Sequence, residues 1–535
     1  MSRLGSIKRK GSPEESIPTI DSPIYLNQIA SLPQEDNIHC LSLKQLIGSP
    51  QLKQTWQFNF CVDLNFILEN IHPKVFRTVD IRITHGYDKK SDSLARLTAQ
   101  KEHCPLQVQL YSVYVPMWGT HHSKIMVNFF EDESCQIVIH TANMVEPDWI
   151  GMSQAIYKTP LLFPKSGGTT SAPSAPNGEE GSSRKKTKNE VQNGVEVVDV
   201  DAETEDESPL ESEMNQVGQQ FQEDFLNYLT NYNHTNELIN KLKNYDFSNV
   251  RAVFIGSVPG KFMDGKESQW GLGRLKHLLG KVEKKEKGKG EGFFDTDICV
   301  SQCSSMGSFG PKQDYLEELM EAFHCKRKQW KFIFPTVGQI QQSMLGWQSG
   351  SSIHFNILGK TSVEQVEDLR QNHNLHKWGS MKAGRERIAP HIKTYLRVSE
   401  SGDRIRWALV TSANLSKPAW GTMEGKGAKS KTARGLRIKS YEAGVLFFPQ
   451  LFENAGSTPS PVCSMVPTYK TNSPKPDIHS TTESHNESKS QLQVGFRMCW
   501  DFPPKEYVSK DEIWSPVVPR KDKDWLGYTW PPTWA

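Results

Sequence analysis

Alternating apolar and polar positions predict β-strands in the first half of the chain. The segments 55–64, 79–84 and 106–115 are rich in β-branched and aromatic residues and partly alternate, which is typical of half-buried strands. The segment 251–260 is a continuous apolar run that ends in Pro-Gly, which indicates a buried strand followed by a turn. The segment 219–229 instead has apolar residues at helical spacing. Strands and helices that alternate in this way predict an α/β protein with mixed sheets and right-handed crossovers.

Polar stretches interrupt this pattern and suggest how the chain is divided. Residues 163–215 begin Ser/Gly/Pro-rich and end acidic with few aromatic residues, so they cannot form a core and predict a disordered insertion. Lys/Glu/Gly-rich 281–292 and Ser/Thr/Pro/Asn-rich 455–492 predict flexible loops. We expect a disordered tail at 1–21, an N-terminal domain at 22–262 that carries the insertion, and a C-terminal domain at 263–535 that carries the two loops.

Length and composition narrow the class of protein. A chain of 535 residues is long enough for two or three domains. The mean hydropathy is −0.57, and no apolar run approaches the roughly 20 residues of a spanning helix, which argues against a membrane protein. The nine cysteines include no CxxC pair, which favours reduced thiols in a cytosolic or nuclear protein over disulfides or a zinc framework. The first residues have no apolar stretch, so we do not expect secretion.

The net charge of +2 conceals two regions of opposite sign. Residues 163–215 contain 5 Lys and Arg against 12 Asp and Glu, whereas the rest of the chain contains 58 against 49. The body outside the insertion is therefore basic. A basic body suits a nucleic-acid partner, because contacts to phosphates supply most of the non-specific affinity for DNA.

A weak internal repeat carries the candidate chemistry. The first copy has His122-Ser-Lys124, then an apolar strand that ends in Ala-Asn143, then Trp149. The second copy has His391-Ile-Lys393, then an apolar strand that ends in Ala-Asn414, then Trp420. In both copies the Trp lies six residues after the Asn. Chance would rarely reproduce all four elements in the same order.

Strand geometry explains the spacing within each copy. Residues i and i+2 of a strand project from one face, so His122 and Lys124 share a side and His121 faces the other way. This alternation argues against a zinc site made by the adjacent histidines. If a pseudo-twofold brought the two copies together, two imidazoles, two ammonium groups and two carboxamides would surround one pocket.

Such a pocket suits a phosphodiester. Two Lys and two Asn supply positive charge and neutral donors for an oxyanion whose charge is spread over several oxygens. Two histidines supply one nucleophile and one general acid, because imidazole changes protonation near neutral pH. No acidic cluster of the kind that holds Mg²⁺ accompanies the repeat. The pattern predicts metal-independent phosphodiester cleavage through a phosphohistidine, with no cofactor.

These residues resemble the phospholipase D superfamily, which pairs two His-Lys motifs in one site. The Asp that usually follows His-x-Lys-x4 is absent, since those positions hold Phe129 and Val398. The later Asn143 and Asn414 are instead similar to the tyrosyl-DNA phosphodiesterase branch. Longer matches span about residues 56–530, and the main ones are 119–124, 304–310, 411–421 and 440–449.

The resemblance implies a fold and a reaction. The fold would be two similar phospholipase D-like α-β-α sandwich domains related by a pseudo-twofold, with the active site at their interface. The reaction would be DNA repair, namely hydrolysis of the 3′-phosphotyrosyl bond between DNA and a trapped topoisomerase I peptide, which leaves a 3′-phosphate. Other 3′ adducts are further candidate substrates.

The resemblance also implies residue roles. His122 would be the nucleophile, and His391 would protonate the tyrosine phenolate and then activate water. Lys124, Lys393, Asn143 and Asn414 would hold the non-bridging oxygens. Family positions that match Glu442 and Gln154 orient the two histidines, and a carboxylate on one imidazole with an amide on the other would give each a distinct tautomer and pKa. Our hypothesis assigns Glu442 to His122 and Gln154 to His391, and the sequence leaves the reverse pairing open.

Substrate contacts follow from matched family positions. Ser305 and Ser308 would give hydroxyl and backbone N–H groups to the next phosphate. Phe60 and Trp118 would stack near a single-stranded DNA end, and core packing is the alternative role for both. Trp530 would lie on the peptide side.

Partners and location are also suggested by short motifs. Residues 195–201 resemble a SUMO-interacting motif, although a chance β-prone patch is the commoner explanation. The basic runs 8–10 and 184–188 suggest nuclear import. Because one chain holds both half-sites, a monomer suffices.

Two other functions compete with this prediction. A lipid phosphodiesterase of the same superfamily would need apolar docking segments, whereas the loops here are hydrophilic. A catalytically silent DNA-binding scaffold would have no need to keep both His-x-Lys motifs intact.

Overall fold

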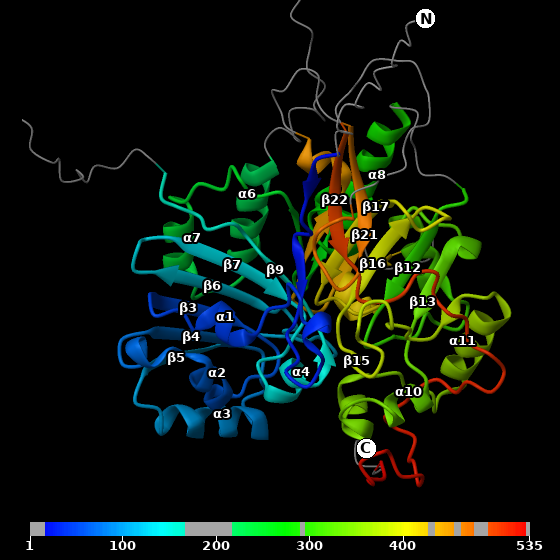
Figure 1. Ribbon diagram of the computed structural model, residues 1–535, viewed down its shortest axis with the longest axis horizontal. Coiled ribbons are helices and arrows are strands. Elements are labelled where there is room, and N and C mark those ends of the chain that lie inside the picture. Colours follow the sequence, from blue (N-terminus) through cyan, green and yellow to red (C-terminus); the bar gives the residue numbers. More distant parts are fainter. Residues whose placement is uncertain are drawn as a thin grey trace, which may run out of the picture.

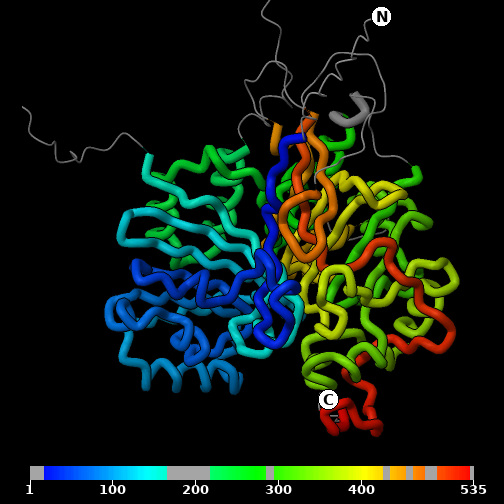
Figure 2. The backbone as a smooth tube through the Cα atoms, in the orientation of Figure 1, coloured from blue at the N-terminus to red at the C-terminus, as the bar shows by residue number. Residues whose placement is uncertain are grey.

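The computed structural model describes residues 17–165, 217–288, 295–425, 434–453, 462–475 and 491–530. Figure 1 shows two halves side by side, each built on a β-sheet with helices around it. The backbone trace in Figure 2 shows that the N-terminal segment, in dark blue, runs between the halves and beside the orange strands of the second half. The predicted class, two α/β halves, is confirmed.

The first half contains a seven-stranded sheet in the order β2-β9-β7-β6-β3-β4-β5. Alternate residues of its strands face two different apolar layers, so both faces of this sheet are buried rather than one, as the half-buried strands of the sequence prediction would have it. One layer includes residues of α1 to α3, and the other includes residues of α6 and α7. The elements are β2 (Ile24–Leu26), α1 (Leu43–Ile47), β3 (Leu52–Phe58), α2 (Leu64–Asn70), β4 (Asp80–His85), α3 (Asp92–Glu102), β5 (Gln107–Ser112), β6 (Ile125–Phe130), β7 (Cys135–His140), α4 (Glu146–Ile150), β8 (Met152–Ser153), β9 (Ala155–Lys158), α6 (Val217–Leu229) and α7 (Asn236–Leu242).

The second half contains a ten-stranded sheet with the path β1-β22-β21-β17-β16-β12-β13-β14, and β20 joins β10 to β17. The elements are β1 (Thr19–Ile20), β10 (Val253–Ser257), β11 (Gly260–Phe262), α8 (Gly271–Gly288), β12 (Ile298–Gln302), α9 (Asp314–Ala322), β13 (Trp330–Ile333), α10 (Val337–Gln341), α11 (Lys360–Gln371), β14 (Leu375–His376), β15 (Ala389–Pro390), β16 (Thr394–Val398), β17 (Ile405–Thr411), α12 (Lys417–Trp420), β18 (Thr422–Glu424), β19 (Gly435–Ile438), β20 (Glu442–Phe447), β21 (Val462–Thr468) and β22 (Gln491–Arg497). Short 3-10 turns lie at Gln34–Asp36, Pro73–Val75, Lys266–Gln269, Arg327–Gln329, Gly346–Ser352 and Pro449–Phe452.

The sequence repeat corresponds to two antiparallel strand pairs. In the first half β6 pairs with β7, with Ile125 opposite Ile139. In the second half β16 pairs with β17, with Thr394 opposite Val410. In each pair the His-x-Lys motif leads into the first strand and the Asn follows the second. The same strand pair is therefore built twice, as a pseudo-twofold requires.

The two halves are joined by backbone contacts close to both repeats. Strand β8 pairs in parallel with β15, with Pro390 opposite Ser153. An isolated bridge joins His121 to Tyr441. These contacts bring residues of one half directly beside the His-x-Lys motif of the other.

Several segments differ from the sequence prediction. Helix α8 continues to Gly288, so residues 281–288 are helical rather than loop, because the Lys and Glu that dominate this stretch are good helix formers. Strand β21 lies within the predicted loop 455–492, where Cys463 and Met465 alternate into the core. In the predicted tail, β1 pairs with β22. Residues 1–16, 166–216, 289–294, 426–433, 454–461, 476–490 and 531–535 lie outside the described residues, and with them most of the predicted insertion.

The domain boundary at residues 262 and 263 stays a prediction. Strand β10 lies before that boundary, yet it pairs with β20 of the second sheet. Among the described residues, no helix is both long and apolar enough to cross a membrane.

Candidate active site

His122 is held at the start of β6 by the other half of the molecule. Its backbone N–H donates to the Tyr441 carbonyl at 2.9 Å. Its ring Nδ1 lies 2.9 Å from Oε2 of Glu442, the first residue of β20. The Ser412 hydroxyl donates to the same carboxylate oxygen. Glu442 therefore contacts the Nδ1 side of His122 rather than Nε2, and its role in orienting the ring stays a prediction.

His391 is held in the same way by residues of the first half. Its ring Nδ1 lies 3.1 Å from Oδ2 of Asp148 in α4 and 3.1 Å from Nε2 of Gln154. The next backbone N–H, that of Ile392, donates to the Ser153 carbonyl at 2.8 Å. Gln154 is thus beside His391, as predicted. Asp148 is a further carboxylate beside His391 that the sequence prediction did not include.

The pseudo-twofold extends to the groups that hold these partners. The Thr141 hydroxyl donates to Gln154 Oε1 at 2.8 Å, and Ser412 donates to Glu442. Thr141 and Ser412 each lie two residues before the Asn of their repeat. Each half therefore supplies a histidine and also the side chains that contact the histidine of the other half.

Both lysines are buried, and each ammonium group bonds to the backbone carbonyl of the histidine two residues before it. Lys124 Nζ donates to the His122 carbonyl at 2.9 Å, and Lys393 Nζ donates to the His391 carbonyl. Burial lowers the pKa of Lys124 to about 8. Burial, together with repulsion from Lys124, lowers the pKa of Lys393 well below its usual value. Two buried ammonium groups close enough to repel one another favour a bound anion.

Asn143 and Asn414 follow the second strand of each copy and are held by local hydrogen bonds. Asn414 Oδ1 accepts the backbone N–H groups of Ser304 at 3.1 Å and Ser305 at 2.9 Å, so its amide N–H groups point elsewhere and can donate. The backbone N–H of Asn143 donates to Asp148 at 2.6 Å, and its carbonyl accepts from the Trp149 indole. The Trp that follows Asn143 therefore fixes the end of the first copy by a direct hydrogen bond.

Burial and the nearby lysines favour the neutral form of both His122 and His391 when no substrate is bound. Burial lowers the pKa of His391 to about 4, with Lys393 acting in the same direction and Asp148 opposing both. Burial and Lys124 also lower the pKa of His122, against the attraction of Glu442. A bound phosphodiester would add negative charge and raise both pKa values.

His121 faces away from this site, as the alternation predicted. Its Nδ1 lies 3.0 Å from the Asn59 carbonyl and its Nε2 lies 3.2 Å from the Tyr232 hydroxyl. Burial lowers the pKa of His121 to about 3. Within the described residues, no group of three or more His, Cys, Asp or Glu is placed to hold a metal ion.

The residues predicted to contact the substrate differ in how close they lie to the catalytic histidines and in whether their polar groups are already used. The Phe60 ring lies 5.4 Å from the His122 ring, and the Lys124 ammonium lies 5.8 Å from the centre of Phe60. Trp118 is 78% exposed, on the loop before His122. The Ser305 backbone N–H is already bonded to Asn414, so it is not available to a phosphate, and the exposed Ser308 hydroxyl accepts the Gly310 N–H.

Trp530 lies in a packed environment. Its indole N–H donates to the Pro516 carbonyl at 2.7 Å, and its ring meets Trp514 edge to face at 5.5 Å. These contacts explain its burial by packing alone, and its predicted contact with the peptide stays a prediction.

Asp148 is the site residue that the sequence prediction missed. It lies five residues after Asn143 and directly before Trp149, whereas Ala419 occupies the matching position in the second repeat. A comparison of the two repeats looks for what they share, so it passes over a residue that only one of them has. An acid beside the repeated Trp was the available signal.

A groove is lined by Tyr441, which packs on His121, and by none of the catalytic candidates. It has a volume of about 770 Å³ and is lined by residues that include Tyr114, Met117, Arg437, Lys439 and Tyr441, the neighbour of Glu442. Tyr114 and Met117 are largely exposed. Exposed apolar side chains beside two cations suit a polyanion that also has flat rings, as a nucleic acid does.

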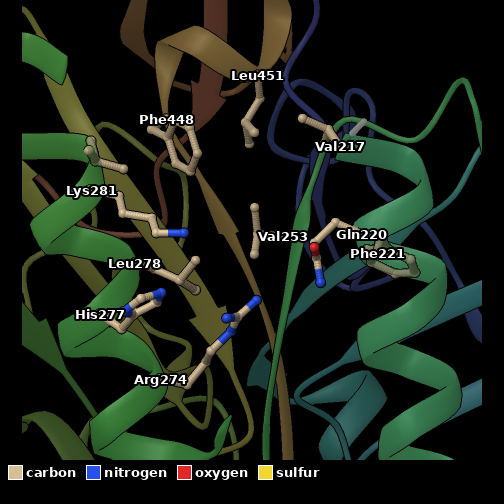
Figure 3. A pocket seen from close by; sticks show the side chains of 11 residues that line it. Val217, Gln220, Phe221, Val253, Arg274, His277, Leu278, Lys281, Phe448 and Leu451 are labelled. Carbon is tan, nitrogen blue, oxygen red and sulfur yellow. The ribbon is translucent and has the colours of Figure 1, made fainter. Parts of the chain in front are cut away.

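A second pocket lies elsewhere. Figure 3 shows it between α6, with Gln220 and Phe221, and α8, with Arg274, His277 and Lys281. None of its lining residues belongs to the two repeats, so it is separate from the candidate active site.

Comparisons with known proteins agree with this geometry. Residues 23–508 match the family model described as tyrosyl-DNA phosphodiesterase. A probable tyrosyl-DNA phosphodiesterase of Schizosaccharomyces pombe is 62% identical over the full length of both chains. Tyrosyl-DNA phosphodiesterase 1 of Drosophila melanogaster is 29% identical over 76% of this chain and 63% of its own. The crystal structure of the yeast tyrosyl-DNA phosphodiesterase is similar in fold, with a TM-score of 0.58 and 19% identity over 92% of this chain and 98% of that chain.

Proposed function

The chain belongs to the tyrosyl-DNA phosphodiesterase family, and from that premise we propose that it hydrolyses the 3′-phosphotyrosyl bond between DNA and a trapped topoisomerase I peptide through a phosphohistidine. The protein is a phosphodiesterase of DNA repair. The observation that supports the detailed reaction is the crossed arrangement, in which each histidine meets a carboxylate from the other half.

In the first step, His122 attacks phosphorus. The Nδ1–H group of His122 donates a hydrogen bond to Glu442, which leaves the Nε2 lone pair as the nucleophile. The P–N bond forms while the P–O bond to tyrosine breaks. His391 donates a proton to the departing phenolate, whose conjugate acid has a pKa of about 10 and which leaves slowly when unprotonated. The peptide departs as free tyrosine phenol.

In the second step, water replaces His122. His391, now neutral, takes a proton from water, and the hydroxide oxygen attacks phosphorus as the P–N bond breaks. His122 recovers its lone pair, and DNA departs with a 3′-phosphate. No metal or cofactor takes part in this scheme.

Charge stabilisation falls to the four remaining repeat residues. Lys124 and Lys393 neutralise the non-bridging oxygens, and Asn143 and Asn414 donate to them. An anion would raise the depressed pKa of both buried lysines and so hold them protonated while substrate is bound.

The groove lined by Arg437, Lys439 and Tyr441 is the surface that we propose for DNA. Its cations Arg437 and Lys439 suit phosphates, and the exposed Tyr114, Met117 and Trp118 suit unpaired bases. We propose that the protein acts as a monomer in the nucleus. The candidate import signals at 8–10 and 184–188 and the SUMO-like motif at 195–201 lie outside the described residues.

The test is incubation in EDTA with a single-stranded oligonucleotide that ends in 3′-phosphotyrosine. We expect release of tyrosine and an oligonucleotide with a 3′-phosphate. The same oligonucleotide with a 5′-phosphotyrosine serves as a comparison substrate. No cleavage in EDTA, with activity restored by a divalent metal, would contradict the proposed reaction.

A further inference from the structure

On the basis of the proposed function, we infer that Asp148 is the positioning residue for His391, that it accepts a hydrogen bond from the Nδ1–H group of that ring, and that Gln154 acts by holding Asp148 in place. The sequence analysis made Gln154 the residue that orients His391; here Asp148 has that role and Gln154 supports it.

Asp148 is placed to accept this hydrogen bond. Its side chain is 2% exposed, and Oδ2 lies 3.1 Å from His391 Nδ1. The same oxygen accepts the backbone N–H of Asn143 at 2.6 Å. A buried carboxylate fixed by a backbone donor has a defined direction, and here that direction is toward the imidazole.

Gln154 is the poorer acceptor in its observed orientation, because its Oε1 lies 3.4 Å from His391 Nδ1 whereas Oδ2 of Asp148 lies 3.1 Å from it. Its Oε1 accepts the Thr141 hydroxyl at 2.8 Å, so its Nε2 faces His391 and Asp148. Nε2 carries only donor hydrogens, and its contacts to the Asp148 carbonyl at 3.2 Å and Oδ2 at 3.3 Å use them. Of the two groups beside Nδ1, only the carboxylate is a strong acceptor. The Nδ1–H group of His391 therefore donates its hydrogen bond to Asp148, and Gln154 fixes the carboxylate.

The second repeat explains why one half needs this extra acid. Glu442 and Gln154 have matching supports in Ser412 and Thr141, so they occupy equivalent places. One is a carboxylate and the other an amide. Asp148 supplies the charge that Gln154 lacks, while Ala419 stands at the matching position where Glu442 makes an acid unnecessary. Each histidine thus has one carboxylate partner: Glu442 of β20 contacts His122, and Asp148 of α4 contacts His391.

This placement has a consequence for proton transfer. With Nδ1 committed to Asp148, the proton that His391 gives and takes must be on Nε2. The charged groups that face His391 are Lys393, Asp148 and Lys124, and only Asp148 stabilises the imidazolium. Loss of that carboxylate would lower the pKa of His391 further, so fewer rings would be protonated at neutral pH.

The decisive variant is Asp148→Asn, which keeps the shape and an oxygen acceptor for the Asn143 N–H. We expect the rate of tyrosine release to fall at least about 10-fold at pH 7.5 with KM little changed. The basic limb of the pH–rate profile should move by about 1 unit toward acid. The matched control is Glu146→Gln, which removes a carboxylate from the same helix that no contact joins to either histidine and should leave both values unchanged.

Gln154→Leu tests the second part of the inference. If Gln154 acts through Asp148, the double variant Asp148→Asn/Gln154→Leu should be little slower than Asp148→Asn alone. Multiplied losses in the double variant would overturn this part. An unmoved basic limb in Asp148→Asn, with the wild-type melting temperature retained, would overturn the first part.

A measurement that needs no turnover separates this inference from the proposed function. ¹⁵N NMR of the free protein should show His391 as the Nδ1–H tautomer, and Asp148→Asn should shift it toward Nε2–H. A protein that leaves 3′-phosphotyrosine intact yet shows this tautomer change would refute the proposed function alone. An active protein whose His391 tautomer is insensitive to Asp148→Asn would refute the inference alone.

Discussion

At the residue scale, the site depends on carboxylates that orient imidazoles, and Glu442 is the first to test. Glu442→Gln keeps the size of the side chain but removes the charge that balances a protonated His122 ring. We expect phosphohistidine formation, measured by single-turnover release of tyrosine, to slow at least about 10-fold. Glu400→Gln removes an exposed carboxylate and is the control. An unchanged single-turnover rate in Glu442→Gln would show that the charge of Glu442 does not assist the attack by His122.

A pH dependence follows from the buried Lys124. Burial lowers the pKa of its ammonium to about 8, against the attraction of Glu442, Cys61 and Asp148. The protonated form binds an anion and the neutral form does not. Titration of Lys124 should therefore make the affinity for an oligonucleotide with a 3′-phosphate fall as the pH rises above about 8, by up to about tenfold per unit. The same oligonucleotide with a 3′-hydroxyl should show a weaker change, and equal pH profiles for the two would argue against Lys124 as the phosphate contact.

Much of the site could be predicted from the sequence because its chemistry is repeated. The His, Lys and Asn of each copy were found by their spacing, and Glu442 and Gln154 by family positions. Asp148 could not be found by comparing copies, since Ala419 replaces it in the other. The use of the Ser305 N–H by Asn414 is a tertiary contact between residues more than 100 positions apart, which no local pattern encodes.

At the scale of elements, the loop before β6, which includes Gly119 and Thr120, packs closely on residues 439–441 of the second half. A Cβ on Gly119 would lie 2.0 Å from the Lys439 carbonyl oxygen, which is backbone and cannot move aside. The adjacent Thr120 carbonyl accepts the Tyr441 N–H, so displacement of this loop would also displace His122. The loop therefore couples the two half-sites.

Gly119→Ala tests that coupling. We expect it to lower the free energy of unfolding by about 1–3 kcal/mol, as overpacking does, and to reduce activity more than about 10-fold. Gly338→Ala in α10 is the control, because nothing lies within 4 Å of its added methyl group. Urea unfolding and the tyrosine-release assay measure both effects. If Gly119→Ala had the stability and activity of the wild type, the close contact between Gly119 and the Lys439 backbone would not be needed to hold the two halves together.

Element prediction succeeded where periodicity was strong and failed where composition was misleading. The helix at 217–229 and the strand at 253–257 follow directly from their apolar spacing. Residues 281–288 looked like loop because charged residues dominate and glycines follow, although Lys and Glu are themselves good helix formers. The Ser/Pro-rich background around β21 similarly hid the alternation of Cys463 and Met465.

At the scale of the whole molecule, the near-neutral total charge hides a basic body. The cations Arg437 and Lys439 line the groove that Tyr441 also lines. The double variant Arg437→Ala/Lys439→Ala should weaken single-stranded DNA binding and reduce the slope of log K against log[salt] by about 0.7 for each phosphate that the protein no longer neutralises. Lys101→Ala, an exposed cation on α3, is the control. An unchanged salt slope would place the DNA elsewhere.

The central claim is that two half-sites form one covalent catalyst, with His122 as the nucleophile and His391 as the acid and base. A variant His391→Ala still carries the nucleophile but lacks the base for the second step, so it should accumulate the covalent intermediate. The most direct measurement is peptide mapping by mass spectrometry after this variant reacts with the 3′-phosphotyrosyl oligonucleotide. We predict one DNA-linked peptide, modified at His122. An adduct on any other residue, or a variant that turns over without forming one, would contradict the account.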